Sequence, residues 1–241
     1  MSYEKTYYAD VARGLSKAKN AEEFLDKELK IIKERMLTLN SAREQMIKGY
    51  EIVLKALKHA YPDLDLNDEN LDGTPDRMAR ALLETCSGLG VQNDREIFCK
   101  SFPLGEYNEM IMLKDIEYTS VCAHHFFPFT GVAHIGYLPR EIESEKAGHQ
   151  VVGLSKLARI VDVYASRPQL QERLCVDIME SIKREIKPSG VMVVIEGKHG
   201  CLACRGAKKE NATMITSAVD GHFKGSQKLR SEFLNLLQMR S

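Results

Sequence analysis

The chain has 241 residues, of which 44% are hydrophobic and 28% charged, which suffices for one large or two small domains with a proper core. Basic and acidic side chains balance at 34 each, so no global field attracts nucleic acid or an anionic membrane. No apolar run approaches the roughly 20 residues of a membrane helix, and the first residues lack the apolar core of a signal peptide. We therefore expect a cytoplasmic protein without nucleic-acid or membrane partners, whose six cysteines are reduced thiols or metal ligands.

The N-terminal part of the sequence has the periodicity of helices. Residues 1–61 are rich in Glu and Lys, and apolar residues recur at three- and four-residue spacing between Leu25 and Met36. A second helical run is predicted to start at Ser41 and to end at Pro62. This pattern indicates packing or subunit contact, and nothing in it suggests chemistry.

The middle of the chain predicts a helix followed by two strands. Thr74 and Pro75 provide a hydroxyl N-cap and a proline in the first turn, and the helix is expected to continue to Gly88. Alternating and β-branched residues predict antiparallel strands over 109–118 and 126–137. The turn between these strands is therefore a place where side chains can converge on a metal.

The last hundred residues predict a mixture of helices and strands. The polar segment 139–150 lacks periodicity and is predicted to be a loop. Two helices, two strands and a final helix are predicted beyond it, in this order: 153–166, 168–186, 191–196, 213–219 and 226–239. Strand pairs beside a helix pair indicate an α+β domain with a mostly antiparallel sheet.

Two short segments carry metal-ligating residue types at matching spacing. Cys122 and His125 are three positions apart, and Cys201 and Cys204 repeat this spacing. A fold that brings the two segments together could build a tetrahedral zinc site. Thiolate and imidazole donors suit zinc, whereas magnesium and calcium prefer oxygen ligands.

The spacing allows either a closed or an open zinc site. Four ligands would make a structural Cys3His site, and spacing alone favours this alternative. In the open alternative three of the four residues bind the metal and water takes the fourth position. His124 and His199 would then remain as acid and base groups beside that water.

Two further segments supply charged groups at helix starts. Residues 152–159 open a predicted helix that carries Lys156 and Arg159 on one face, a favourable place for an anion. The next predicted helix begins with Gln171 and Glu172.

Five motifs in this order resemble GTP cyclohydrolase I: CAHHF, GLSKLAR, RPQLQERL, HGCLACRG and SQKLRSEFL. The resemblance runs from about Asn67 to the end, so we expect a helical N-terminal extension over 1–66 and a catalytic domain over 67–241. It implies the α+β tunnelling fold, a mostly antiparallel sheet with a helix pair on one face. It also implies a homo-oligomer, a decamer of two stacked pentamers with active sites between subunits.

The resemblance implies a zinc-dependent hydrolase that converts GTP and water to 7,8-dihydroneopterin triphosphate and formate, the first step of tetrahydrofolate or pterin biosynthesis. Cys122, His125 and Cys201 match the zinc ligands of the family, and the zinc would activate the water that attacks C8 of guanine. His124 and His199 match its proton-transfer residues.

The same resemblance implies further catalytic and substrate-binding residues. Ser155 matches a residue assigned to the later rearrangement, although a serine at a helix start ordinarily caps the helix. Glu172 would accept hydrogen bonds from N1–H and the 2-amino group of guanine, and Gln171 would add a contact near the reacting ring. Without the resemblance, both would be expected on exposed helix surface. The phosphate contacts implied are Lys156, Arg159, Arg205, Arg77 and Arg80.

Two residues depart from the family pattern. Ala123 stands where the family usually has Glu, and Cys204 stands where it has an apolar or small residue. Two alternatives therefore stay open: a divergent homologue that only opens the guanine ring to a formamidopyrimidine, and a non-enzymatic structural-zinc protein closed by Cys204. A reductase of the same fold acting on a deazaguanine nitrile is disfavoured by the metal cluster.

Overall fold

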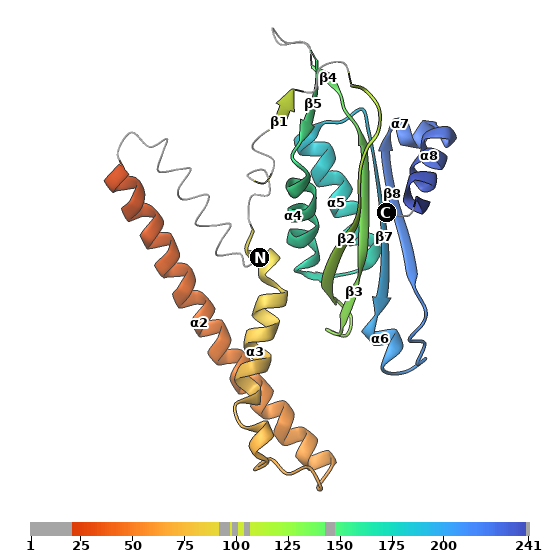
Figure 1. The fold of residues 1–241 in the computed structure, drawn as a ribbon. Coiled ribbons are helices and arrows are strands. Elements are labelled where there is room, and N and C mark those ends of the chain that lie inside the picture. The colour runs from red at the N-terminus through yellow and green to blue at the C-terminus, as the bar shows by residue number, and fades with distance from the viewer. Residues whose placement is uncertain (1–20, 92–96, 98–100, 104–106, 143–147, 240–241) are drawn as a thin grey trace. The chain divides into compact units, whose positions relative to one another are not determined.

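The computed structural model describes most of the chain as two compact units, residues 1–84 and 85–241 (Figure 1). The described ranges are 21–91, 97, 101–103, 107–142 and 148–239. None of the helices in these ranges has the length and apolar character needed to cross a membrane. The domain boundary expected between residues 66 and 67 remains a prediction.

The first unit is built on one long helix, α2 (Ala21–Ala60). The prediction of a second helical run starting at Ser41 is wrong, because the helix passes through this residue without a break. The Ser41 Oγ accepts a hydrogen bond from Gln45 Nε2 at 3.4 Å within the helix, and no proline interrupts the segment. The prediction for residues 1–20 lies outside the described residues.

A second helix of the first unit, α3 (Thr74–Thr85), begins where the sequence predicted. It follows the short 3-10 helix η1 (Glu69–Leu71). Arg43 on α2 donates from Nε to Asp76 Oδ1 on α3 at 2.6 Å, and this ion pair joins the two helices.

The helix α3 ends three residues before the predicted Gly88, because the chain tightens into the 3-10 helix η2 (Ser87–Gly90). The Gly88 N–H donates to the Ser166 carbonyl at 2.8 Å. A Cβ at position 88 would lie 2.1 Å from the Val163 carbonyl oxygen, so only glycine permits this close approach.

The second unit contains a five-stranded sheet in the order β6-β2-β3-β7-β8. Its strands are β2 (Ile111–Cys122), β3 (Pro128–Leu138), β6 (Pro168–Gln169), β7 (Gly190–His199) and β8 (Met214–Gly221). All neighbours pair antiparallel except β2 and β6, which are parallel. The predicted α+β fold with a mostly antiparallel sheet is confirmed, and it is consistent with the tunnelling-fold family.

Two helices cover one face of this sheet, as the sequence predicted (Figure 1). They are α4 (Leu154–Ala165) and α5 (Gln171–Ile186). Their apolar residues recur at helical spacing, so Leu157 and Ile178 are completely buried against strand residues such as Ile135 and Ile195. This packing forms the main core.

The opposite face carries a smaller core beneath the C-terminal helices α7 (His222–Gly225) and α8 (Gln227–Gln238) (Figure 1). Phe223 and Phe233 are fully buried there and meet edge to face, with ring centroids 6.3 Å apart. The Ser226 Oγ accepts from the Leu229 N–H and caps α8.

A second, three-stranded sheet corrects the predicted loop over 139–150. Its order is β1-β5-β4, with β1 (Ser101–Pro103), β4 (Glu141–Ile142) and β5 (Gly148–Val152). Pairs as short as that between β4 and β5 leave no periodic pattern in the sequence, which explains why they were missed. Residues 143–147 lie outside the described residues.

Candidate metal centre and active site

A tight turn between β2 and β3 holds the first two candidate ligands, where the sequence placed them. The Cys122 N–H donates to the Phe127 carbonyl, and the Phe126 N–H donates to the Cys122 carbonyl, both at 2.8 Å. Phe126 adopts a left-handed conformation with φ of 56°, which helps to reverse the chain so tightly. Cys122 is buried at the end of β2 and His125 is exposed in the turn.

A separate segment brings the third candidate ligand to this turn. The strands β3 and β7 pair antiparallel, with Phe129 opposite His199. The short helix α6 (Gly200–Ala203) follows β7 directly and carries Cys201. Strand pairing therefore joins two segments that are almost eighty residues apart in sequence.

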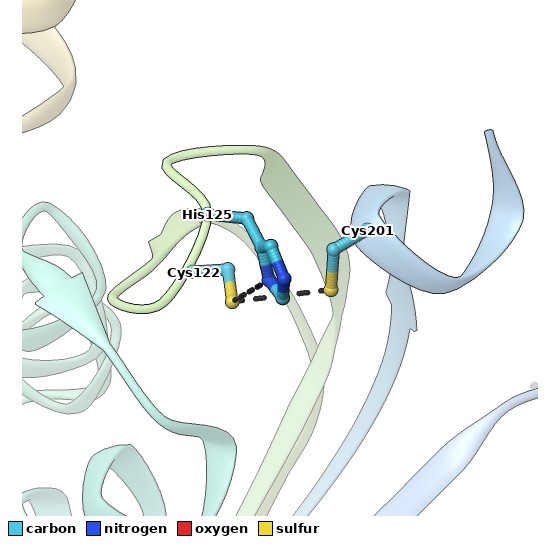
Figure 2. A group of neighbouring side chains, drawn as sticks. All are labelled: Cys122, His125 and Cys201. Carbon is cyan, nitrogen blue, oxygen red and sulfur yellow. Dashed lines mark hydrogen bonds between the residues drawn. The ribbon is translucent and has the colours of Figure 1, made fainter. Parts of the chain in front are cut away.

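Cys122, His125 and Cys201 point toward one another (Figure 2), with their ligand atoms all within 4.8 Å. The Cys122 Sγ lies 3.9 Å from His125 Nδ1 and 3.9 Å from Cys201 Sγ. Two sulfur ligands of a tetrahedral zinc are about 3.8 Å apart, given a Zn–S distance of about 2.3 Å. The donor set and its spacing thus fit a thiophilic metal ion.

The electrostatics of the sulfurs also favour a cation. Burial raises the pKa of the Cys201 thiol, and the neighbouring Cys122 raises it further, while Arg205 opposes the shift. Two thiolates this close repel each other unless a positive charge lies between them.

Cys204 is not a member of this group. Its exposed thiol donates to the Gly200 carbonyl at 2.8 Å, so the side chain is engaged within its own helical turn. Across the described residues, Cys122, His125 and Cys201 form the one group of three or more potential ligands. The arrangement supplies three protein donors and not the four of a closed Cys3His site.

His199 lies at the end of β7, two residues before Cys201, and is held on two sides. Its ring stacks on Phe129, with centroids 4.5 Å apart and planes inclined by 8°. Its Nε2 lies 2.9 Å from Gln171 Oε1. Burial lowers the pKa of His199, and the nearby Glu172 carboxylate partly opposes this shift.

Gln171 and Glu172 are neighbours in the first turn of α5 with opposite surroundings. Gln171 is 1% exposed, so the ordinary expectation of exposed helix surface is wrong for this residue. Glu172 is exposed, and its charge acts on His199.

His124 and Ser155 are both exposed. The His124 ring lies edge to face with His125, with centroids 6.1 Å apart. Ser155 does not cap α4, because Gly153 occupies the N-cap position. The plain capping role expected for a serine at this helix start is therefore wrong.

The candidate phosphate contacts lie on three separate segments. Lys156 and Arg159 are half-buried on α4, and Arg205 is exposed just after α6, close enough to act on the Cys201 thiol. Arg77 donates to the Asp72 carbonyl at 2.7 Å, and Arg80 pairs with Asp76 at 3.3 Å. These last two arginines belong to the first unit, and their role toward the site remains a prediction.

The sequence reasoning missed three residues that contact His199 or its partner Gln171: Phe129, Gly197 and Thr216. Phe129 fell within the strand predicted over 126–137, and Gly197 lay just beyond the strand predicted over 191–196. A glycine near the end of a buried strand was the available signal, since it often marks a close approach of another group.

Comparison with known proteins shows which family the chain belongs to. The family model of GTP cyclohydrolase I matches residues 51–238. The chain belongs to the GTP cyclohydrolase I family. Members include the GTP cyclohydrolase 1 of Thermoanaerobacter pseudethanolicus, which is 42% identical over 198 residues, covering 82% of this chain and 98% of the relative.

Two other GTP cyclohydrolase I family members are similarly close. The GTP cyclohydrolase 1 of a Dehalococcoides mccartyi strain is 44% identical over 174 residues, 72% of this chain and 88% of its own. That of Streptomyces griseus is 44% identical over 176 residues, 73% and 83% of the two chains. The solved apo structure of the archaeosine synthase QueF-Like matches at a TM-score of 0.38 and 22% identity, covering 48% of this chain and 97% of its own, which is too low to support an inference. The family resemblance drawn from the five motifs is confirmed.

Proposed function

We propose that this protein is a GTP cyclohydrolase I that converts GTP and water to 7,8-dihydroneopterin triphosphate and formate, the first step of a pterin or tetrahydrofolate pathway. Membership in the family supports GTP cyclohydrolase activity. The observation that carries the proposal is the convergence of Cys122, His125 and Cys201 beside His199.

The proposed metal is Zn2+, held by Cys122, His125 and Cys201. Two sulfurs and one imidazole nitrogen are a donor set that zinc accepts and that magnesium and calcium do not. When bound, zinc would lower the pKa of water to about 7 and so supply hydroxide at neutral pH. The engagement of Cys204 with the Gly200 carbonyl supports a site with three protein ligands.

We assign recognition of guanine to Glu172. A carboxylate can accept hydrogen bonds from both N1–H and the 2-amino group, which adenine cannot offer. Its influence on His199 supports this assignment, since the recognised base would then lie next to a proton-transfer group.

The triphosphate is assigned to a set of cations. Because it carries about four negative charges, several basic side chains are needed to hold and orient it. Arg205 stands close to Cys201 and would link this anchor to the metal. The full proposed set is Lys156, Arg159, Arg205, Arg77 and Arg80.

Proton transfers are assigned to His199 and His124, with Ser155 acting in the later rearrangement. Ring opening, formate release, rearrangement and closure of the pterin ring each move protons, so more than one acid or base is required. The lowered pKa of His199 keeps its imidazole neutral near pH 7, ready to accept a proton.

We further propose that the active form is a homo-oligomer, a decamer of two pentamers, with residues 1–66 as a helical extension and 67–241 as the catalytic domain. Family membership supports this assembly. Analytical ultracentrifugation of the full chain at several concentrations tests it.

The direct test is to incubate metal-loaded protein with GTP and to measure formate and, after oxidation, the fluorescent pterin. Equal amounts of the two products are expected, and a His125→Ala variant with reduced metal content should release neither. A formamidopyrimidine nucleotide without pterin would show that the reaction stops early. Binding of metal and GTP without any product would exclude the proposed activity.

A further inference from the structure

Gln171 is a polar side chain that lies almost completely buried. It is 1% exposed and stands at the first position of α5, facing the ends of β7 and β8. Its Nε2 lies 3.0 Å from the Ile195 carbonyl, 2.9 Å from the Met214 carbonyl and 3.2 Å from Thr216 Oγ1. Its Oε1 lies 2.9 Å from His199 Nε2. Every polar atom of the amide is thus engaged within the chain.

These partners fix the orientation of the amide. The carbonyl oxygens of Ile195 and Met214 can only accept hydrogen bonds, so the NH2 group of Gln171 must face them. Turning the amide over would place Oε1 against two carbonyl oxygens, which repel it, and would face the NH2 group toward His199. The Oε1 atom therefore faces His199 as an acceptor.

The orientation of Gln171 in turn fixes His199. An acceptor at 2.9 Å requires a hydrogen on His199 Nε2, so in the neutral ring Nδ1 carries the lone pair. Stacking on Phe129 holds the plane of the ring. The hydrogen bond to Gln171 therefore sets which nitrogen bears the hydrogen, and the stacking on Phe129 sets the direction in which both nitrogens point.

The strand β7 leaves room for the hydrogen bond between Gln171 and His199 because position 197 is a glycine. A Cβ on Gly197 would lie 2.3 Å from Gln171 Oε1 and 2.7 Å from Tyr118 Oη. Alanine at position 197 would therefore displace the Gln171 amide. The space around the Gln171 to His199 hydrogen bond thus depends on a glycine that is two residues before His199 in the same strand.

We propose that Gln171 is a positioning residue that holds His199 with its hydrogen on Nε2 and leaves Nδ1 as the nitrogen available to the substrate. The proposal rests on the proposed function of His199 and replaces the direct substrate contact expected for Gln171. The side chain is 1% exposed and both of its polar atoms are hydrogen-bonded within the chain, which favours a role through His199 over direct contact with the reacting ring.

Two substitutions of Gln171 separate positioning from stability. Gln171→Leu removes the acceptor for His199, whereas Gln171→Glu keeps an oxygen there and removes the N–H donors to Ile195 and Met214. For metal-loaded Gln171→Leu we expect kcat for formate release to fall about tenfold to a hundredfold, with KM for GTP changed by less than about threefold. The melting temperature of Gln171→Glu should be no higher than that of Gln171→Leu, whereas its kcat should be larger.

Gln169 offers a matched control. It is 2% exposed, donates from Nε2 to the Tyr164 carbonyl and to Asp177, and accepts from Arg173, so its side-chain hydrogen bonds go to groups other than His199. Gln169→Leu should lower the melting temperature while its loss of kcat stays well below that of Gln171→Leu. If kcat simply followed melting temperature across all three variants, Gln171 would be a structural residue and the proposal would be wrong.

A spectroscopic readout does not depend on activity. In metal-loaded protein labelled with 15N-histidine, the ring signals of His199 are identified by their loss in His199→Ala. We expect the hydrogen on Nε2 in the wild-type protein and in Gln171→Glu, and a mixture of tautomers in Gln171→Leu and Gly197→Ala. A wild-type His199 with its hydrogen on Nδ1 would overturn the proposal. If wild-type protein released no formate from GTP, the proposed function would fail while this measurement still decided the position of the hydrogen.

Discussion

The two segments that meet at the metal group have the same ligand spacing and different structures. Cys122 and His125 are three positions apart in a hairpin turn, and both point into the group. Cys201 and Cys204 are also three positions apart, in and just after the one-turn helix α6, yet only Cys201 belongs to the group. Cys204 hydrogen-bonds to the Gly200 carbonyl instead.

The difference shows that spacing alone does not make a ligand. In the turn, the hydrogen bond from the Phe126 N–H to the Cys122 carbonyl closes the backbone around residues 123–125, and the side chains of Cys122 and His125 lie together. In α6 the first residue of the pair faces the turn, while the second is exposed and bonded to its own backbone. The placement of the second side chain of each pair, toward the group for His125 and onto the Gly200 carbonyl for Cys204, therefore decides between a site with three protein ligands and one with four.

The largest effect is expected from removing the one ligand that α6 provides. Cys201→Ala should lose the metal and lower formate release about a thousandfold, because two donors from the turn cannot hold the ion alone. Metal content by mass spectrometry and formate release measure this result. Cys86→Ala, which changes a thiol outside the group, is the control and should keep both.

The pH dependence of the metal affinity reports how many thiols bind the metal. A thiol must lose its proton to bind a metal, and burial raises the pKa of Cys201, so acid weakens binding and alkali strengthens it. With two thiols, the affinity should rise about a hundredfold per pH unit between about pH 7 and pH 8, above the pH range in which histidine ligands ordinarily lose their proton. Competition with a chromophoric chelator measures the slope. A rise near a thousandfold per unit would mean that Cys204 is a third thiolate ligand.

A smaller effect is expected from removing the backbone strain at Phe126 in the turn. This residue has φ of 56° and is 54% exposed, so its side chain contributes little packing. Phe126→Gly should raise the free energy of unfolding by up to about 1 kcal/mol, because glycine adopts this conformation without strain. Urea unfolding of metal-loaded protein measures it. Destabilisation would show that the aromatic ring makes contacts that matter more than the backbone strain.

The smallest effect is expected at Cys204. Cys204→Ala should keep one metal per chain and retain formate release within about twofold, because its exposed thiol hydrogen-bonds to the Gly200 carbonyl and lies outside the metal group. Metal titration and steady-state kinetics check both values. Loss of the metal in this variant would contradict a site with three protein ligands and restore the structural-zinc alternative.

Much of the fold could be predicted because its signals are local. The apolar periodicity of α5, the β-branched run of β7 and the threonine before Pro75 are each explained by a few neighbouring residues. The same holds for the turn that carries Cys122 and His125. The continuation of α2 through Ser41 was not predicted, because a serine is compatible with both a helix start and a helix interior.

The sequence by itself determined the types of chemical group that are present: three thiols and one imidazole at metal-ligand spacing, and the five motifs that identify the family. Only the tertiary structure decided which of these groups meet. Pairing of β3 with β7 brings Cys201 to the turn, and the conformation of α6 directs Cys204 away from it. The burial of Gln171 against β7 and β8 was equally invisible in the sequence, because a glutamine at a helix start is ordinarily solvated. Contacts between residues distant in sequence depend on how the strands and helices pack, and no local pattern records that packing.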